Sequence, residues 1–472
     1  MQVTWAIYLI ALGGLALYAA HRLTLVARAL RRQPTAPPPL PADSELPIVT
    51  VQLPLFNERA VAARVIAAAC RLDWPRDRLE IQVLDDSTDD TRALVADEVL
   101  AWRAHGVDVV HLHRTDRRGW KAGALEAGRV VARGSLHAVF DADFVPPPDF
   151  VRRTVGHFAD PRVGMVQARW AHLNRSASLL TELQAMLLDG HFAVEQAGRA
   201  SSGACFNFNG TAGLWRASAV EAAGGWQADT LTEDLDLSYR AALAGWRFVY
   251  ASEVAAPAEL PADVLAFKSQ QFRWAKGSIE CARKLARPAV RAPWPLRHRV
   301  EALFHLTHNL PYLLTLVVLL AGGAALAVGH GPTWAGPVHV LSALVTLLVL
   351  GAFVLASQPR DRLAALLRLP SLIALTAGLA VSQSRAILLG LAGRTTPFIR
   401  TPKDGAIGRT PATRLYRVAP SPNTLAELAL GLYLSTCAAL CLARGSPVSA
   451  FLLAFLALAT LSIALTSLRS TR

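Results

Sequence analysis

Five short motifs of charged and aromatic residues follow one another along this chain, and their residue types suit one kind of chemistry. Paired carboxylates can bind a divalent cation, a further carboxylate can accept a proton, and an arginine can hold a phosphate. The motifs are Asp85-Asp86, Asp141-Ala142-Asp143, Thr232-Glu233-Asp234, QQFRW at 270–274 and FIRTPK at 398–403. Together they predict a site that binds a nucleotide-sugar on a metal and transfers the sugar beside a membrane.

The second motif is the predicted metal site. Asp141 and Asp143 are separated by one residue and follow an apolar run at 137–140, so both side chains can point to one spot at the end of a strand. A departing diphosphate develops negative charge, which Mg²⁺ or Mn²⁺ would offset. We expect Asp143 to contact the divalent cation and Asp141 to contact the cation or a ribose. The alternative is a polar turn ahead of three prolines at 146–148.

The third motif supplies a candidate base. An acceptor hydroxyl must lose a proton as it attacks the anomeric carbon, and a single in-line displacement inverts that carbon. Asp234 precedes a helix-like run at 235–243, and we expect it to be the general base. The alternative is an acid that only stabilises the helix through its dipole.

The fourth motif combines a cation with an aromatic ring. Arg273 can hold the departing diphosphate with two parallel hydrogen bonds. Trp274 offers a flat apolar face for the acceptor sugar, and Gln270 would hydrogen-bond nearby. Lys121, between Gly119 and Gly123, could neutralise the diphosphate. The alternatives are an amphipathic surface helix with an aromatic anchor and a solvent-exposed lysine.

The elements that must position these residues alternate in type between residues 47 and 259. Apolar runs at 48–54, 81–84, 107–112 and 137–140 predict strands, the first ended by Pro54, and 60–71 has a helical pattern. Such alternation predicts an α/β domain with a mainly parallel sheet and helices on both faces. Ligands on such sheets lie at the carboxyl ends of the strands, where the first two motifs fall.

The rest of the chain points to a membrane. Hydrophobic residues make up 53% of the sequence. Five segments each offer roughly 18 to 20 mostly apolar residues, enough to span a bilayer as a helix. They are residues 3–20, 310–329, 338–356, 425–442 and 450–467. A buried core helix could explain any one of these segments but not the whole set.

Charge predicts the orientation of these spans. No positive side chain precedes the first segment, whereas Arg22 and Arg28 follow it, which favours an uncleaved anchor with the following domain in the cytoplasm. The net charge of +13 then reflects basic clusters that bind anionic lipids, and we expect no nucleic acid partner. The loop 329–337 lacks Lys and Arg and should be external. Residues 371–393 contain Gln383 and Arg385 and should form a helix in the cytoplasmic interface.

These expectations divide the chain into seven segments. They are an N-terminal anchor (1–21), a basic and proline-rich linker (22–46), the catalytic domain (47–260), interfacial helices with the QxxRW motif (261–300), two spans (301–357), an interfacial helix with the FIRTPK motif (358–423), and two spans with a basic tail (424–472).

The motif set resembles the family 2 glycosyltransferases of the cellulose-synthase superfamily. Asn57-Glu58, the paired aspartates, D-A-D, T-E-D and Q-x-x-R-W carry this resemblance. The fuller strings QLPLFNE (52–58), VQARW (166–170) and FNGTAGLWR (208–216) are most similar to the cellulose-synthase-like A group, the mannan and glucomannan synthases and their bacterial relatives. The resemblance covers about 47–410 and implies a GT-A-like domain inserted between transmembrane helices.

The resemblance also implies roles for individual residues. Asp85 and Asp86 would bind the base and ribose of the donor, unless they only cap a helix. The FIRTPK motif resembles a gating loop, F-x-V-T-x-K, with Arg400 where that pattern has Val. The implied contacts are Asn57, Glu58, Asp85, Asp86, Lys121, Asp141 and Arg273 for the donor, Glu233, Asn209, Gly210, Gln270 and Trp274 for the acceptor, and Phe398, Thr401 and Lys403 for the gate.

Two functions fit these residues. One is an inverting, processive synthase that takes UDP-glucose or GDP-mannose, extends a β-linked polysaccharide and exports it. The other is a lipid glycosyltransferase that makes glycosyldiacylglycerol or glucosylceramide. Four spans after the catalytic domain and the gating motif favour the first. The expected partners are a nucleotide-sugar, a glycan or lipid acceptor and membrane lipids, and the expected location is a bacterial-type inner membrane with the catalytic domain in the cytoplasm.

Overall fold

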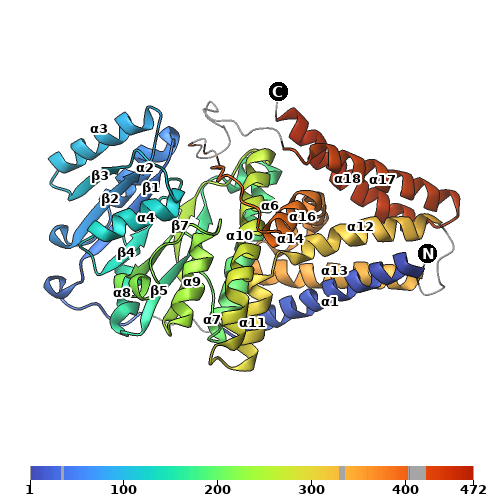
Figure 1. Ribbon diagram of the computed structural model, residues 1–472, viewed down its shortest axis with the longest axis horizontal. Helices are drawn as coiled ribbons and strands as arrows, with labels where there is room; N and C mark the ends of the chain where they lie inside the picture. Colours follow the sequence, from blue (N-terminus) through green and yellow to red (C-terminus); the bar gives the residue numbers. More distant parts are fainter. Residues whose placement is uncertain are drawn as a thin grey trace.

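The computed structural model describes residues 2–32, 37–328, 335–358, 360–401, 403, 405 and 421–470. A sheet domain forms one end of the molecule and long helices form the other (Figure 1). Two helices, α10 (Val264–Arg291) and α11 (Leu296–Leu306), lie between these two parts. The site predicted from the sequence falls at this boundary, because α10 carries the QxxRW motif.

The sheet domain contains seven strands in the order β3-β2-β1-β4-β6-β5-β7. Every neighbouring pair is parallel except the two pairs that β6 makes. The strands are β1 (Val49–Leu55), β2 (Leu79–Asp85), β3 (Val109–His113), β4 (Leu136–Val139), β5 (Val163–His172), β6 (Gly213–Arg216) and β7 (Arg247–Ala258). The prediction of a mainly parallel α/β sheet is confirmed.

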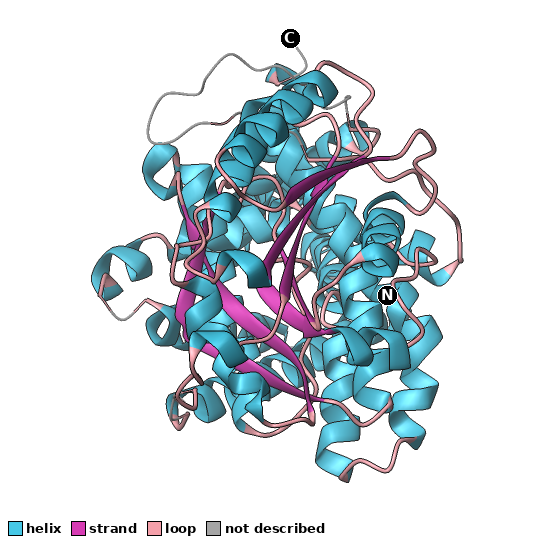
Figure 2. Cartoon of the chain, turned by 90° about the vertical axis from the view of Figure 1, so that its left-hand side faces the viewer, coloured by secondary structure: helices cyan, strands magenta, loops and turns pink. Residues whose placement is uncertain are grey.

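Helices cover both faces of this sheet (Figure 2). One core cluster joins Ile81 and Val83 of β2 to Val61, Val95 and other apolar side chains of one helical layer. The layers are α2 (Arg59–Cys70), α3 (Thr91–Ala104) and α5 (Phe150–Val155) on that face, and α4 (Trp120–Val131), α8 (Ala217–Ala222) and α9 (Glu233–Leu243) on the other. Burial on both faces explains why the strands read as continuous apolar runs.

The prediction that Pro54 ends the first strand is wrong, since β1 continues to Leu55 and Pro54 pairs with Leu84. The reason lies on the other side of β1. The Gln52 carbonyl accepts from the Phe140 amide, and β4 pairs with β1 only as far as Gln52. The nitrogen of Pro54, two residues later, points to the same side of β1, where β4 is no longer paired. Its missing N–H therefore costs no hydrogen bond of the sheet.

Five helices in the described part of the chain are long and apolar enough to cross a membrane, as the sequence predicts. They are α1 (Gln2–Leu30), α12 (Leu310–Val328), α13 (Ala335–Ser357), α17 (Thr424–Ala443) and α18 (Pro447–Arg469). The helix α1 continues to Leu30, past the expected boundary after residue 21, and the division of the chain into segments stays a prediction. Arg22 and Arg28 therefore lie on this helix, where they pair with Glu195 and Glu301. These charge pairs fasten the anchor to the rest of the protein.

The segment 371–393 differs from the single helix that we expected. It forms part of α15 (Leu369–Gly378) and α16 (Ala380–Leu391), which meet at a bend of 45° and follow a short α14 (Arg362–Leu367). Gln383 and Ser384 are buried, and Ser384 donates to the Tyr312 carbonyl. These two polar side chains therefore face protein, which sequence alone did not indicate, whereas Arg385 is exposed. The position of this segment in the membrane stays a prediction, and the expected outer loop at 329–337 lies largely outside the described residues.

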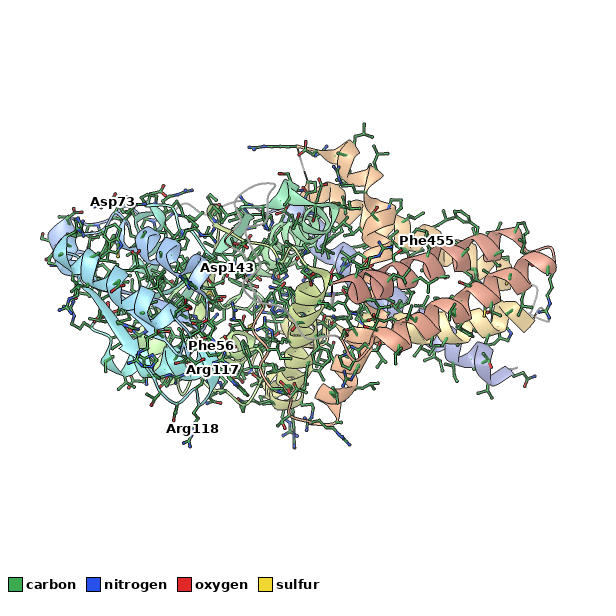
Figure 3. All side chains as sticks on the ribbon, turned by 90° about the horizontal axis from the view of Figure 1, so that it is seen from above. Phe56, Asp73, Arg117, Arg118, Asp143 and Phe455 are labelled. Carbon is green, nitrogen blue, oxygen red and sulfur yellow. The ribbon has the colours of Figure 1, made fainter. Side chains whose placement is uncertain are left out.

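The segment that links the sheet domain to the spans contains α6 (Leu179–Gly190), a π-helix (His191–Gln196) and α7 (Ala197–Ser201). Asp263 caps α10 by accepting hydrogen bonds from the Leu265 and Ala266 amides. In Figure 3, Asp143 lies where the sheet domain meets the helical part, whereas Phe455 of α18 lies well inside the helical part.

Candidate active site

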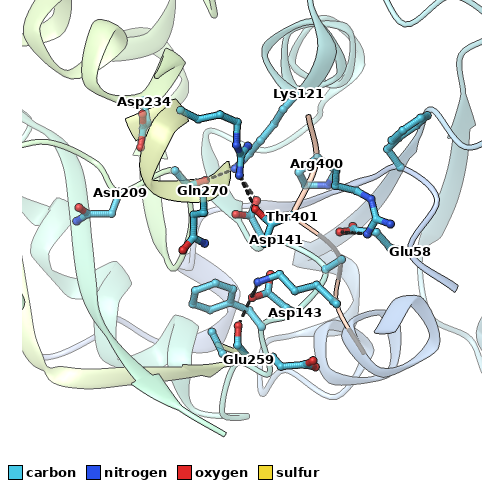
Figure 4. A pocket seen from close by; sticks show the side chains of 18 of the residues that line it. Glu58, Lys121, Asp141, Asp143, Asn209, Asp234, Glu259, Gln270, Arg400 and Thr401 are labelled. Atoms are coloured by element: carbon cyan, nitrogen blue, oxygen red, sulfur yellow. Dashed lines mark hydrogen bonds and ion pairs between the residues drawn. The ribbon is translucent and has the colours of Figure 1, made fainter. Parts of the chain in front are cut away.

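A cavity lies at the carboxyl ends of β1, β4 and β5, between the sheet domain and α10 (Figure 4). Residues from all five motifs line it, and the lining includes Glu58, Asp86, Lys121, Asp141, Asp143, Asn209, Gly210, Glu233, Asp234, Gln270, Arg273, Trp274, Phe398, Arg400, Thr401 and Lys403. Motifs that are more than 300 residues apart in the sequence thus share one space.

The two aspartates of the D-A-D motif each face a lysine. Asp141 Oδ1 lies 2.5 Å from Lys121 Nζ, which also donates to the Gly210 carbonyl at 2.9 Å. Asp143 Oδ2 lies 2.6 Å from Lys403 Nζ. Burial by itself lowers the pKa of Lys121, but Asp141 and Glu233 outweigh it and the pKa is raised. Both carboxylates are therefore placed where positive charge is favourable.

These carboxylates fit a hard divalent cation by the chemistry of their donor set. Two carboxylates separated by one residue supply the oxygen ligands that Mg²⁺ or Mn²⁺ takes from proteins. Asp143 and Asp141 would hold the cation, which would supply positive charge to a diphosphate. Lys403 competes with a cation for Asp143, since its ammonium group occupies one of the two carboxylate oxygens.

Glu233 and Asp234 begin α9 beside Lys121, whose Nζ lies 3.8 Å from Glu233 Oε1. Burial and the neighbouring Glu233 raise the pKa of Asp234 to about 7. Gly210 adopts a positive φ of 81°, and a Cβ at this position would lie 3.2 Å from Asp234 Oδ2. A glycine thus lets the backbone approach the acid closely, and a carboxylate with a pKa near neutrality suits a general base.

The segment formed by residues 398–401 and 403 is here called the strap, and four of its side chains line this cavity: Phe398, Arg400, Thr401 and Lys403. Phe398 stacks on Trp120 with ring centroids 6.0 Å apart, and the Arg273 guanidinium lies 4.6 Å from the Phe398 ring centre. Arg273 also donates to Thr401 Oγ1 at 2.8 Å. Arg400 and Thr401 reach into the space between Asp141 and Glu58 (Figure 4). The strap thus connects the QxxRW motif with the carboxylates of the D-A-D motif.

Arg400, the residue that departs from the gating pattern, has a partner of its own. Its guanidinium lies 3.4 Å from Glu58 Oε1. Burial raises the pKa of Glu58 to about 7, against the opposing effect of Arg400. A valine at position 400 would leave this buried carboxyl without that cation.

Two predicted donor residues do not line the cavity. Asp85 is fully buried and accepts hydrogen bonds from His111 Nε2 at 2.9 Å and from the Ser87 amide. Asn57 bonds to the side chains and backbone of Ser87 and Thr88 instead. Asp86 does line it, but Arg114 takes both carboxylate oxygens. Contact of these groups with a donor stays a prediction.

Asp85, His111 and His113 form a group that the sequence reasoning missed. Their ligand atoms all lie within 4.8 Å of one another, close enough to hold a metal ion. The signal was the H-x-H spacing on β3, which places both imidazoles on one face of the strand. Nitrogen and oxygen ligands of this kind suit transition metals better than Mg²⁺.

A second cavity continues from the first toward the spans. Trp274, Gln270, Asp234 and Asn209 line both cavities. The second one is also bounded by side chains from α12, α13, the π-helix and α7, among them Tyr312, Phe353, His191, Glu195 and Arg199. Sequence reasoning missed this wall, because it comes from elements that carry no motif. Asp234 and Trp274 therefore lie between the first cavity and the second, which extends to α12 and α13.

Comparison with known proteins places the chain in a family. A sequence model described as "Glycosyltransferase like family 2" matches residues 47–277. Glucomannan 4-beta-mannosyltransferase 7 of Arabidopsis thaliana is 36% identical over 84% of this chain and 72% of its own length. Glucomannan 4-beta-mannosyltransferase 2 of the same plant is 37% identical over 82% of this chain and 74% of its own length. Glucomannan 4-beta-mannosyltransferase 1 of Oryza sativa subsp. japonica is 43% identical over 59% of this chain and 56% of its own length.

A solved structure supports the fold alone. The mannosyltransferase PcManGT from Pyrobaculum calidifontis, in complex with GDP-Man and Mn²⁺, superposes with a TM-score of 0.54 at 21% identity, covering 77% of this chain and 99% of that one. The fold, the shared cavity and the extent of the sequence matches agree with one another. This chain is therefore a glycosyltransferase that belongs to family 2, and its relatives there include the glucomannan 4-beta-mannosyltransferases.

Proposed function

We propose that this enzyme transfers mannose from GDP-mannose, with inversion, to the end of a β-linked mannan or glucomannan. The observation that carries the proposal is the convergence of Lys121, Asp141, Asp143 and Asp234 in one cavity that a second cavity extends toward the spans. The choice of mannose over glucose rests on the printed names of the relatives.

In the proposed reaction, the chain's own residues bind the diphosphate and move one proton. Lys121 and Arg273 lie on the cavity wall as cations for the phosphates. Asp234 accepts the proton of the acceptor hydroxyl as that oxygen attacks the anomeric carbon from the side opposite the leaving diphosphate. A divalent cation held by Asp143 and Asp141 would supply further positive charge when bound. In-line attack inverts the anomeric configuration.

The acceptor is proposed to approach through the second cavity. Trp274 and Trp170 lie with ring centroids 6.5 Å apart and line both cavities. Flat aromatic faces bury the apolar face of a sugar ring and leave its hydroxyl groups free. Because this route passes the side chains of α12 and α13, we favour a polymer that is extended processively and exported over a lipid acceptor.

We further propose that the protein crosses a membrane several times, with the catalytic domain on the cytoplasmic face. Among the described residues, five helices are long and apolar enough to do so, and the arginines that follow the first span favour this orientation. The named relatives come from plants. They lend no support to the bacterial-type inner membrane expected above, so the proposal does not extend to the kind of membrane.

The test is an assay of purified membranes with radiolabelled GDP-mannose, UDP-glucose and UDP-N-acetylglucosamine in parallel. The product is sized, digested with a β-mannanase and partitioned between water and chloroform–methanol. We expect the label from GDP-mannose to appear in a polymer that stays out of the organic phase and that the β-mannanase digests. A labelled product that enters the organic phase would refute the proposed polymer synthesis and favour the lipid glycosyltransferase.

A further inference from the structure

His172 lies on the wall of the first cavity, and no motif includes it. It is the last residue of β5, its side chain is 5% exposed, and it lines the cavity together with Asp143 and Trp274. Trp170, two residues earlier on the same strand, lines the cavity as well. Residues i and i+2 of a strand point to one face, so His172 and Trp170 share one wall of the cavity.

Asp189 of α6 holds the imidazole in one orientation. His172 Nε2 lies 3.0 Å from Asp189 Oδ1. Burial raises the pKa of Asp189, but hydrogen bonds from His172 and Gln358 and the charge of Arg175 outweigh burial and lower it. An ionised carboxylate only accepts hydrogen bonds, so Nε2 must be the donor. In the neutral ring, Nδ1 then carries the lone pair.

The carboxylate itself is held by two further side chains. Arg175 Nη1 donates to Asp189 Oδ2 at 2.7 Å, and Gln358 Nε2 donates to the same oxygen at 2.8 Å. Arg175 also donates to Gln358 Oε1 at 2.8 Å, which closes a ring of three hydrogen-bonded groups. Asp189 therefore keeps its position without His172, and His172 is the only member of this network that lines the first cavity.

Nothing in the described part of the chain hydrogen-bonds to His172 Nδ1. A hydrogen-bond acceptor on a cavity wall that no protein group meets accepts from water or from a ligand. Beside two tryptophans in a sugar-transferring enzyme, the complementary group is a sugar hydroxyl, which donates one hydrogen bond. Asp234 is the acid placed for proton transfer, so His172 has a binding role.

We propose that His172, oriented by Asp189, accepts a hydrogen bond from a hydroxyl group of the sugar in this cavity and thereby contributes to sugar selection. The hydroxyl belongs either to the transferred sugar or to the acceptor end, which are chemically alike at this point. This inference rests on one part of the proposed function, namely that a sugar binds in this cavity. It does not depend on which nucleotide-sugar is used.

The test compares three variants of the full-length enzyme in detergent, assayed with whichever nucleotide-sugar the wild type transfers. His172→Phe keeps a ring of similar size but removes the acceptor. We expect KM for either the donor or a mannooligosaccharide acceptor to rise roughly two- to tenfold, as loss of one neutral hydrogen bond implies. The substrate whose KM rises identifies which hydroxyl is bound.

His172→Gln and Gln358→Met are the matched variants. Glutamine can donate to Asp189 through its amide nitrogen and accept through its oxygen, so it should recover most of the lost affinity. Gln358→Met breaks the Asp189 network away from the cavity and should leave both KM values within twofold of the wild type. Thermal unfolding of all variants should be similar, since Arg175 still holds Asp189.

Three results would overturn the proposal. They are unchanged KM values for both substrates in His172→Phe, no recovery in His172→Gln, and an equal rise in KM in Gln358→Met, which would make the role of the network purely structural. A wild type that ignores GDP-mannose but uses another donor would refute the proposed donor and leave the His172 comparison intact.

Discussion

Replacing Lys403 by methionine should tighten the binding of Mn²⁺ in the absence of any nucleotide. Lys403 Nζ lies 2.6 Å from Asp143 Oδ2 and donates to the Glu259 carbonyl at 3.1 Å. Its side chain is 9% exposed and that of Asp143 is 10% exposed. A cation that binds Asp143 must compete with this ammonium group, and methionine removes the charge while keeping an unbranched side chain that is one atom shorter.

The size of the effect follows from the lost ion pair. Hydrogen bonds to charged groups contribute about 1.5–3 kcal/mol. Since 1.4 kcal/mol corresponds to a factor of ten in affinity, the dissociation constant for Mn²⁺ should fall by roughly 10- to 100-fold. The same variant should make polymer more slowly, because the strap loses one cation that can close over a bound diphosphate.

The assay is a titration of purified protein with Mn²⁺, followed by electron paramagnetic resonance of the free ion. Arg400→Met is the matched control, because it removes another strap cation whose partner is Glu58 and not the D-A-D motif. An unchanged dissociation constant in Lys403→Met, or an equal change in both variants, would show that Lys403 does not compete with the metal at Asp143.

Three further predictions follow from the site. Asp143→Ala should abolish sugar transfer while the protein still enters membranes, and excess EDTA should silence the wild type; full activity in either case would refute the metal assignment. Asp234→Asn should lower turnover by about 10²-fold or more with donor binding preserved, and the wild-type rate should rise with pH up to about 7 and then level off, because burial and Glu233 raise the pKa of this acid. A donor-affinity loss in Asp234→Asn would instead make it a binding group. Cysteines introduced at 394–401 should react with an impermeant thiol reagent only after lysis, and labelling in intact cells would place the strap outside.

The sequence by itself determined most of the fold class and the content of the site. Alternating apolar runs predicted the parallel sheet, and the strand ends predicted where carboxylates such as Asp141 and Asp143 gather, because side-chain periodicity and strand direction are local properties. Five apolar segments of sufficient length predicted the spans for the same reason. Spacing also identified Asp234, whose position at a helix start needs no tertiary information.

Only the tertiary structure decided which of these groups meet. Lys403 reaches Asp143 across 260 residues of sequence, and no local pattern encodes such a contact. The Asp85 side chain bonds to His111 and does not line the cavity, because β2 and β3 pair in a register that sets Asp85 opposite His113, two residues after His111 on the same face of the strand. Pro54 stays in its strand because β4 ends early, and His172 enters the cavity wall because Asp189 on a distant helix orients its ring. Packing and register between elements fix these outcomes, and both depend on the whole chain.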